Sequence, residues 1–147
     1  MIVLDANILI RAVLGKRVRL LLEEYVPHGV RFCAPDDAYA EAEKYLPFLL
    51  AKKNRNDAEV STTLLYLRCL VEAVDCESYS VFEESARQRL RGRDENDWPV
   101  LATALMLNCL IWTEDTDFFG TGAAVWNTSR IEIYLRAETK SSEIGDA

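Results

Sequence analysis

Aspartate side chains follow closely on two apolar runs of this chain. Asp5 comes directly after the run from Ile2 to Leu4. Asp115 and Asp117 come just after a second run, which ends at Thr113. Carboxylates gathered in one place raise one another's pKa, so a cluster of them needs a cation. Hard oxygen ligands favour Mg²⁺ or Mn²⁺, and such an ion polarises a phosphate oxygen and activates a bound water for phosphodiester hydrolysis.

Two more acids are expected to reach the same place. Asp97 opens a predicted helix that leads into the second apolar run and carries Pro99 in its first turn, where proline is tolerated. Glu41 follows Pro35 by little more than one helical turn, on another predicted helix. Asp5 and Asp97 could instead be helix caps, and Glu41 could face solvent. The joint occurrence of all these acids favours a common site.

The elements that must position these acids alternate between strand and helix. The predicted strands are Ile2–Leu4, Val30–Ala34, a weak one at Val74–Cys76, Leu110–Thr113 and Ala124–Trp126. The predicted helices run from about Ile8 to Val26 with an interruption near Gly15, from a cap at Asp37 to Leu50 with Pro47 as a kink point, and over Ala58–Ala73, Ser80–Leu90 and Asp97–Leu107, with a last short element at Ile131–Leu135. This alternation predicts an α/β fold with a mostly parallel sheet covered on both faces. Sites in such sheets lie outside the carboxyl ends of the strands, where Asp5 and Asp115 stand.

The composition fits one globular domain that is not built to coat nucleic acid. The chain has 147 residues, and half of them are apolar, which is enough for a core. Its 24 acidic residues against 17 basic ones give a net charge of −7, whereas proteins that simply coat nucleic acid are basic. We expect one domain over residues 1–137, followed by a polar and frayed tail over residues 138–147.

The four cysteines and the single histidine predict neither a zinc site nor a disulfide framework. No two cysteines form a CxxC pair, so buried free thiols in a reducing cytosol are the expected state. The apolar start MIVLDANILI lacks a basic region and carries Asp5 in its middle, which predicts neither a signal peptide nor a membrane span. We therefore expect a cytoplasmic protein that does not act at a membrane.

Three stretches of the chain carry a family pattern. DANILI at the start, DWPVLATAL in the predicted helix that Asp97 opens, and IWTEDTDFFGTG after it occur in this order. Together they resemble the motifs of the PIN-domain ribonucleases, and particularly those of the VapC-like toxins of toxin–antitoxin pairs. The resemblance spans nearly the whole chain, from Met1 to about Tyr134. It implies a three-layer α/β/α fold with a parallel sheet, and RNA cleavage that depends on Mg²⁺ or Mn²⁺.

The resemblance also implies roles for individual residues. The places of the metal-binding and catalytic aspartates are taken by Asp5, Asp97 and Asp115. Asp117 fits an additional metal-binding acid. Asn7 takes the place of the polar residue that steadies the first aspartate, and Thr113 is expected to support the site beside it.

The catalytic glutamate of the family matches Glu41, with Ala42 and Leu46 at the positions that the motif requires. Glu43 lies only two residues on but on a different helix face, so both cannot point equally at one metal, and the choice between them stays open. The resemblance further implies a small antitoxin protein as a partner and a second copy of the chain in a homodimer.

Arginine side chains beside these motifs are candidates for holding RNA phosphates. Arg91 and Arg93 belong to the alternating run QRLRGR ahead of Asp97, and Arg11 belongs to a second basic group near the first motif. Such phosphate contacts supply affinity without reading sequence. A solvated charged face is the alternative for both groups. Core packing is the default for the tryptophans near the motifs, with base stacking as the alternative for Trp98.

Other protein classes also place an aspartate after a strand. A PIN-like scaffold module without catalysis would not need the full set of acids. A phosphatase of the haloacid-dehalogenase type would have an aspartate where Asn7 stands, and a receiver domain would have a lysine after a late strand. A flap-type DNA nuclease would need a longer chain for its DNA-binding elements. We therefore expect a metal-dependent endoribonuclease, with the inactive module and the aspartyl-phosphate phosphatase as alternatives.

Overall fold

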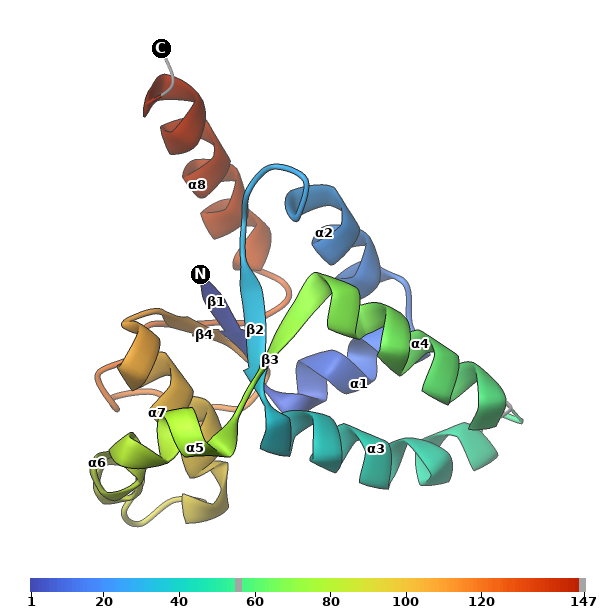
Figure 1. Ribbon diagram of the computed structural model, residues 1–147, viewed down its shortest axis with the longest axis horizontal. Coiled ribbons are helices and arrows are strands. Elements are labelled where there is room, and N and C mark those ends of the chain that lie inside the picture. The colour runs from blue at the N-terminus through green and yellow to red at the C-terminus, as the bar shows by residue number, and fades with distance from the viewer. Residues whose placement is uncertain (55–56, 146–147) are drawn as a thin grey trace.

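A sheet of five parallel strands forms the centre of the molecule (Figure 1). The structure is a computed structural model, and it describes residues 1–54 and 57–145. The strands are β1 (Ile2–Leu4), β2 (Phe32–Pro35), β3 (Val71–Val74), β4 (Leu110–Trp112) and β5 (Val125–Trp126). Their order across the sheet is β3-β2-β1-β4-β5, so the chain builds outward in one direction from β1 and then returns to build outward from β4. Ligand sites in such sheets lie at this reversal, between β1 and β4.

Helices cover both faces of the sheet, because successive residues of a strand point to opposite sides. Ile2, Leu4 and Trp112 pack into a core with one group of helices. That group consists of α1 (Ala6–Leu14), α2 (Arg17–Tyr25), α3 (Asp36–Ala51), α4 (Asp57–Leu70) and the start of α8 (Ile131–Gly145). Val3 and Ile111 pack on the opposite side, against a second group. That group consists of α5 (Cys76–Tyr79), α6 (Glu83–Arg89) and α7 (Trp98–Leu107). The predicted three-layer α/β/α fold is confirmed.

Helix α7 fixes the position of Asp97. Its buried residues lie nearly all round the helix, from Pro99 to Ala104, because it packs against strands β1, β2 and β4 as well as against α6. Asn108 ends the helix in the left-handed conformation, at a φ of 49°, and the chain then enters β4. A helix that leads into a parallel strand begins at the carboxyl edge of the sheet, so Asp97 at the start of α7 lies at the same edge as Asp5 and Asp115.

The third strand differs from its prediction. A helix over Ala58–Ala73 and a weak strand at Val74–Cys76 were expected, but α4 ends at Leu70 and β3 covers Val71–Val74. The strand pairs in register with β2, from Phe32 opposite Val71 to Pro35 opposite Val74. Sheet pairing therefore overrides the helical pattern of the sequence, which continued into these residues.

Several helix boundaries also differ. The expected helix over Ser80–Leu90 is two short pieces, a 3₁₀ turn η1 (Ser80–Phe82) and α6, and the four-residue helix α5 precedes them. Asp37 is not the cap of α3, because Pro35 holds that position and Asp37 lies inside the first turn. The element expected to be short at Ile131–Leu135 is the start of α8, which continues past Glu138 to Gly145 and projects from the body of the molecule (Figure 1). The division into a domain over 1–137 and a tail over 138–147 stays a prediction.

The cysteines are free, as predicted, but only Cys33 is buried, whereas Cys69 and Cys76 are exposed and Cys109 is half-buried. None of the helices in the described part of the chain has the length and apolar character needed to cross a membrane.

Candidate metal centre

Asp5 occupies the junction of β1 and α1. Its backbone N–H donates to the Trp112 carbonyl at 3.1 Å, which joins the ends of β1 and β4. Its side chain caps α1, where Oδ1 accepts from the Ala6 N–H at 2.7 Å. The residue is only 5% exposed, which is unusual for an aspartate. The capping role that the sequence offered for Asp5 is therefore present.

Thr113 and Asn7 connect the two strand ends through a network of neutral polar groups. The Thr113 hydroxyl donates to Asp5 Oδ2 at 2.7 Å and accepts from Asn7 Nδ2 at 3.2 Å and from the Asp115 N–H at 2.9 Å. Asn7 Nδ2 also lies 3.2 Å from Asp5 Oδ2, and Asn7 Oδ1 accepts from the Glu114 N–H. One hydroxyl thus uses its donor and both acceptor positions, and it fixes both the Asp5 carboxylate and the start of the following loop.

The pKa of Asp5 is raised, chiefly by burial. The bonds from Thr113 and Ala6 act in the opposite direction because they stabilise the carboxylate, while the charge of Asp115 raises the pKa further.

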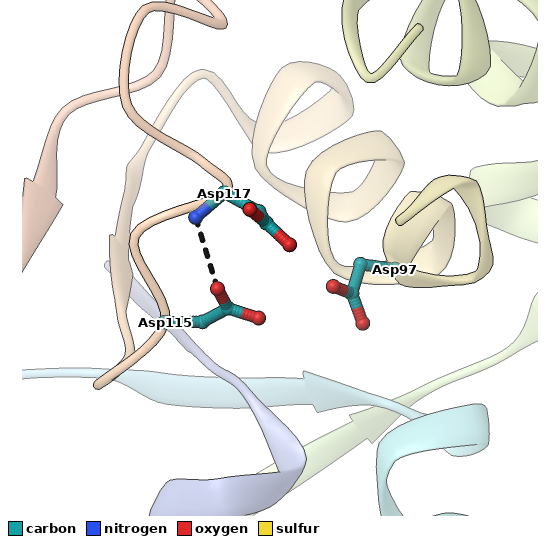
Figure 2. A group of neighbouring side chains, drawn as sticks. All are labelled: Asp97, Asp115 and Asp117. Atoms are coloured by element: carbon teal, nitrogen blue, oxygen red, sulfur yellow. Dashed lines mark hydrogen bonds between the residues drawn. The ribbon is translucent and has the colours of Figure 1, made fainter. Parts of the chain in front are cut away.

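Asp97, Asp115 and Asp117 form the group whose geometry suits a metal ion. Each offers one carboxylate oxygen, and these oxygens lie within 4.8 Å of one another. Figure 2 shows the three side chains around a common space, with Asp97 from the start of α7 and the other two from the loop after β4. The Asp117 N–H donates to Asp115 Oδ1 at 2.9 Å, so a tight turn brings these two acids together. Asp5 lies outside this group but close to it. Its charge raises the pKa of Asp97, and the charge of Asp115 raises the pKa of Asp5.

Asp97 has the most strongly shifted pKa among the acids of the site. It stands at the N-cap position of α7, yet its side chain makes no capping hydrogen bond to the described backbone. The pKa of this carboxyl is raised to about 8, first by burial and then by the charges of Asp5, Asp94, Asp115 and Glu41 in that order. A carboxyl that is neither capping nor stably ionised without a counter-charge is a candidate metal ligand. Asp97 thus holds the N-cap position that the capping alternative gave it, but its side chain does not act as the cap.

Glu41 and Glu43 are now distinguished by what surrounds them. Glu41 lines a cleft of about 570 Å³ together with Asp94 and Asp97. Its side chain is exposed as a whole, but partial burial of its carboxyl in the cleft, and then the charge of Asp5, raise its pKa. Glu43 points elsewhere, toward Arg68 of α4, with which it forms an ion pair at 3.6 Å. Of the two glutamates that the sequence left open, Glu41 is therefore the one that belongs with the acidic site.

The donor set fits a hard divalent cation. Ligand oxygens on opposite sides of an octahedral Mg²⁺ lie about 4 Å apart, because each bond is about 2.0–2.1 Å long. Three carboxylates whose oxygens already lie within 4.8 Å of one another can thus reach one ion by small side-chain rotations. The donors are all oxygen, which favours Mg²⁺ or Mn²⁺ over zinc.

The predicted RNA-binding arginines occupy different settings. Arg11 is exposed in the last turn of α1, roughly two turns away from Asp5. Arg91 is exposed after α6 and lines a shallow cavity together with acids such as Glu84 and Glu95. Arg93 instead donates to the backbone of the loop after β4, through the carbonyls of Asp117 (2.7 Å) and Phe119. Whether any of them holds RNA stays a prediction.

Two further residues shape the site, namely Arg89, which the sequence offered only as part of the run QRLRGR, and Glu114, which it did not single out. Arg89 donates to the Thr121 carbonyl at 2.7 Å, farther along the same loop as Arg93. Glu114 accepts from the Thr128 N–H at 2.8 Å, and the Thr128 hydroxyl accepts from the buried Trp112 side chain at 3.1 Å. Nothing in the sequence could reveal these bonds, because each depends on tertiary placement of residues that are unremarkable in type.

Comparisons with known proteins agree with this fold. A family model described as PIN domain matches residues 3–136. No curated protein matches the sequence. VapBC2 of Rickettsia felis, solved with a fragment of promoter DNA, has a TM-score of 0.64 at 17% identity, over 86% of this chain and 98% of that one. A toxin–antitoxin complex from Klebsiella pneumoniae has a TM-score of 0.60 at 19% identity, over 87% and 98% of the two chains. VapBC-1 of Haemophilus influenzae has a TM-score of 0.57 at 21% identity, over 88% and 99%. At these identities the structural likeness shows a shared fold.

Proposed function

The chain belongs to the PIN domain family, and from that premise we propose that it is an endoribonuclease that depends on Mg²⁺ or Mn²⁺. The observation that carries the proposal is the convergence of Asp97, Asp115 and Asp117, with oxygens within 4.8 Å of one another, at the reversal of the strand order. Proteins of this family are generally nucleases, and carboxylates around a hard cation suit phosphodiester hydrolysis.

The residues divide the work between binding and positioning. Asp97, Asp115 and Asp117 would hold the ion, whose chemistry would be to polarise the scissile phosphate and to activate water for attack. Asp5, fixed by Thr113 and Asn7, adds a carboxylate beside them whose orientation does not depend on the ion.

Glu41 stands at the cleft beside these acids. Its pKa is raised by burial and by the charge of Asp5, so its carboxyl can take up or release a proton near the scissile bond.

An aspartyl-phosphate mechanism is disfavoured by the setting of Asp5. That residue is 5% exposed, and its two carboxylate oxygens accept bonds from Ala6, Asn7 and Thr113. A nucleophile must reach the phosphorus atom of its substrate, and a carboxylate in this position is neither accessible nor free to move.

A metal-dependent cleavage assay tests the enzymatic proposal. Purified wild type should cleave single-stranded RNA with Mg²⁺ or Mn²⁺ and stop when EDTA is added. Asp97→Asn should cleave at least about 100-fold more slowly, since even residues that only support metal ligands cost about 10–100-fold. Glu43→Gln is the control, because Glu43 pairs with Arg68 away from the acids. Equal, metal-independent cleavage by wild type and Asp97→Asn would contradict the proposal and favour the scaffold alternative.

We also propose that the chain is the toxin of a toxin–antitoxin pair, that it acts in the cytoplasm and that it forms a homodimer. The support is its family together with a fold shared with toxin–antitoxin complexes. Induction of the protein in bacterial cells should stop growth, and co-expression of a small protein encoded next to it should restore growth. An induced, folded protein that leaves growth unchanged would contradict the toxin assignment.

A further inference from the structure

Arg89 and Arg93 donate hydrogen bonds to the loop that carries Asp115 and Asp117. Arg93 Nη1 donates to the carbonyls of Asp117 and Phe119, and Arg89 Nη1 donates to the Thr121 carbonyl. We call these two side chains the arginine clamp. The carbonyls that accept these bonds extend along the loop from Asp117 to Thr121, so the clamp holds most of the loop between Asp115 and β5.

The loop is shaped to receive the two guanidinium groups. Gly120 and Gly122 have φ angles of 80° and 98°, which L side chains rarely adopt. A Cβ atom built on Gly122 would lie 2.3 Å from Arg89 Nη1, and one on Gly120 would lie 3.4 Å from Arg93 Nη2. The GTG sequence thus serves both the turn and the close approach of the clamp.

The clamp joins the two chain segments that supply the acidic group. Arg93 lies four residues before Asp97, and the turn between them is tight. Asp94 accepts from the Asn96 N–H at 3.0 Å, and the Asp97 N–H donates to the Asp94 carbonyl at 3.3 Å. A side chain at one end of this turn therefore fixes where the carboxylate at the other end stands relative to the loop.

We propose that Arg93, assisted by Arg89, is a positioning residue that sets the spacing between Asp97 and the pair Asp115 and Asp117, so that the three carboxylates converge before a cation arrives. The bonds go to main-chain carbonyls, which leaves the carboxylate oxygens available to an ion. Clustered acids push one another apart, and the clamp opposes this separation. The inference rests on the proposed function, because it assigns the clamp to the same metal centre.

Mn²⁺ titration calorimetry on the full chain tests the clamp without relying on activity. Arg93→Ala should bind Mn²⁺ about 10–100-fold more weakly than wild type, which is the usual cost of losing a residue that orients metal ligands. Arg91→Ala is the matched control. Arg91 is exposed and lies two residues before Arg93, so its replacement removes the same charge. Its Mn²⁺ affinity should equal that of wild type. Hydrogen exchange of the metal-free proteins should be faster over residues 115–122 in Arg93→Ala alone.

The outcomes separate the clamp from the proposed function. Wild type that binds no Mn²⁺ overturns both. Wild type that binds Mn²⁺, with Arg93→Ala unchanged or with Arg91→Ala equally weakened, overturns the clamp alone. A loss of thermal stability without a loss of affinity in the folded variant means a purely structural role and also overturns it. If Arg93→Ala does not fold, Arg93→Lys replaces it, because lysine keeps the charge but not the planar fork, and wild-type affinity in that variant overturns the clamp.

Discussion

Asp5 and Asp97 lie in one acidic site, but their surroundings are built in opposite ways. Asp5 is buried and accepts hydrogen bonds from Ala6, Asn7 and Thr113, which stabilise its carboxylate. Asp97 is half-buried, makes no capping bond to the described backbone of its helix, and has acids as its electrostatic neighbours. We refer to the first as the bonded side and to the second, with Asp115 and Asp117, as the repulsive side.

The difference separates what the fold provides from what a cation must provide. On the bonded side, neutral donors hold a carboxylate in place at all times, and the arrangement forms part of the junction of β1, β4 and α1. On the repulsive side, the backbone and the arginine clamp bring carboxylates together against their mutual repulsion, and a divalent ion would relieve it. Substitutions on the bonded side should therefore damage stability first, and those on the repulsive side should damage metal binding first.

Asp115→Asn should show the largest effect, a loss of at least about 100-fold in Mn²⁺ affinity. Asparagine keeps an oxygen to accept from the Asp117 N–H, so the turn survives while one negative charge is removed. Thermal stability without metal should be equal to or higher than that of wild type, because repulsion falls. Calorimetric titration with Mn²⁺ measures the affinity, and Asp75→Asn, an exposed acid at the start of α5, is the control. A variant with lowered thermal stability but wild-type Mn²⁺ affinity would contradict the comparison.

Thr113→Val should cause the next largest effect, a loss of about 2–3 kcal/mol of unfolding free energy. The substitution keeps the shape but removes a buried hydroxyl with three partners, which leaves Asp5 and the Asp115 N–H without a bond that each had. Thr62→Val is the control, because Thr62 is exposed on α4 and its hydroxyl donates within its own helix, to the Ala58 carbonyl. Its cost should stay within about 0.5 kcal/mol. Urea unfolding of both variants measures these losses. Equal midpoints for the two variants would contradict the claim that the bonded side contributes specially to stability.

The two sides were also unequally predictable from sequence. Asp5, Asp97 and Asp115 could be placed at one edge because strand ends and helix starts have fixed positions in a parallel α/β sheet. Strands β1 and β4 lie inside the sheet and are wholly buried, so each is a short apolar run that the sequence makes recognisable. The start of β3 was misplaced, since its pairing with β2 depends on a neighbour in space rather than on its own pattern.

The side-chain contacts that hold the site together could not be predicted from the sequence. The bonds from Arg93 to Asp117 and Phe119 link residues 24 and 26 positions apart, and the bond from Arg89 to Thr121 links residues 32 apart. An arginine beside an acidic motif indicates phosphate binding as readily as carbonyl binding, because the same donors serve both. The choice between Glu41 and Glu43 likewise required the position of Arg68 on another helix.

Glu41→Gln should lower RNA cleavage by about 10-fold, whereas Glu43→Gln should leave it unchanged. General acid–base groups contribute about 100-fold or more when fully engaged, and the exposed position of Glu41 at the cleft argues for the lower effect. Stability should change by less than about 0.5 kcal/mol in either variant. Initial rates on labelled RNA with Mn²⁺ measure the difference. A larger loss in Glu43→Gln would reassign the family's glutamate and move the edge of the site toward α4.

The pH dependence of stability without metal gives the smallest effect and the sharpest test of the repulsive side. The pKa of Asp97 is raised to about 8 in the folded chain, so the folded state holds this proton more tightly than the unfolded state does. The resulting stabilisation is fully present below about pH 4, near the unfolded pKa, and is lost as the pH rises through about 8. Metal-free wild type should thus match Asp97→Asn near pH 4 and be less stable by about 1 kcal/mol near pH 9, a value kept small for solvent screening. Thermal unfolding in EDTA should show this as a gap of about 2–4 °C, and Mn²⁺ should raise the Tm of wild type but not that of the variant. The opposite result would be a wild type that gains stability over Asp97→Asn as the pH rises. It would mean that Asp97 is stabilised as a carboxylate without metal, as Asp5 is by its hydrogen bonds, and the distinction between the two sides would fail.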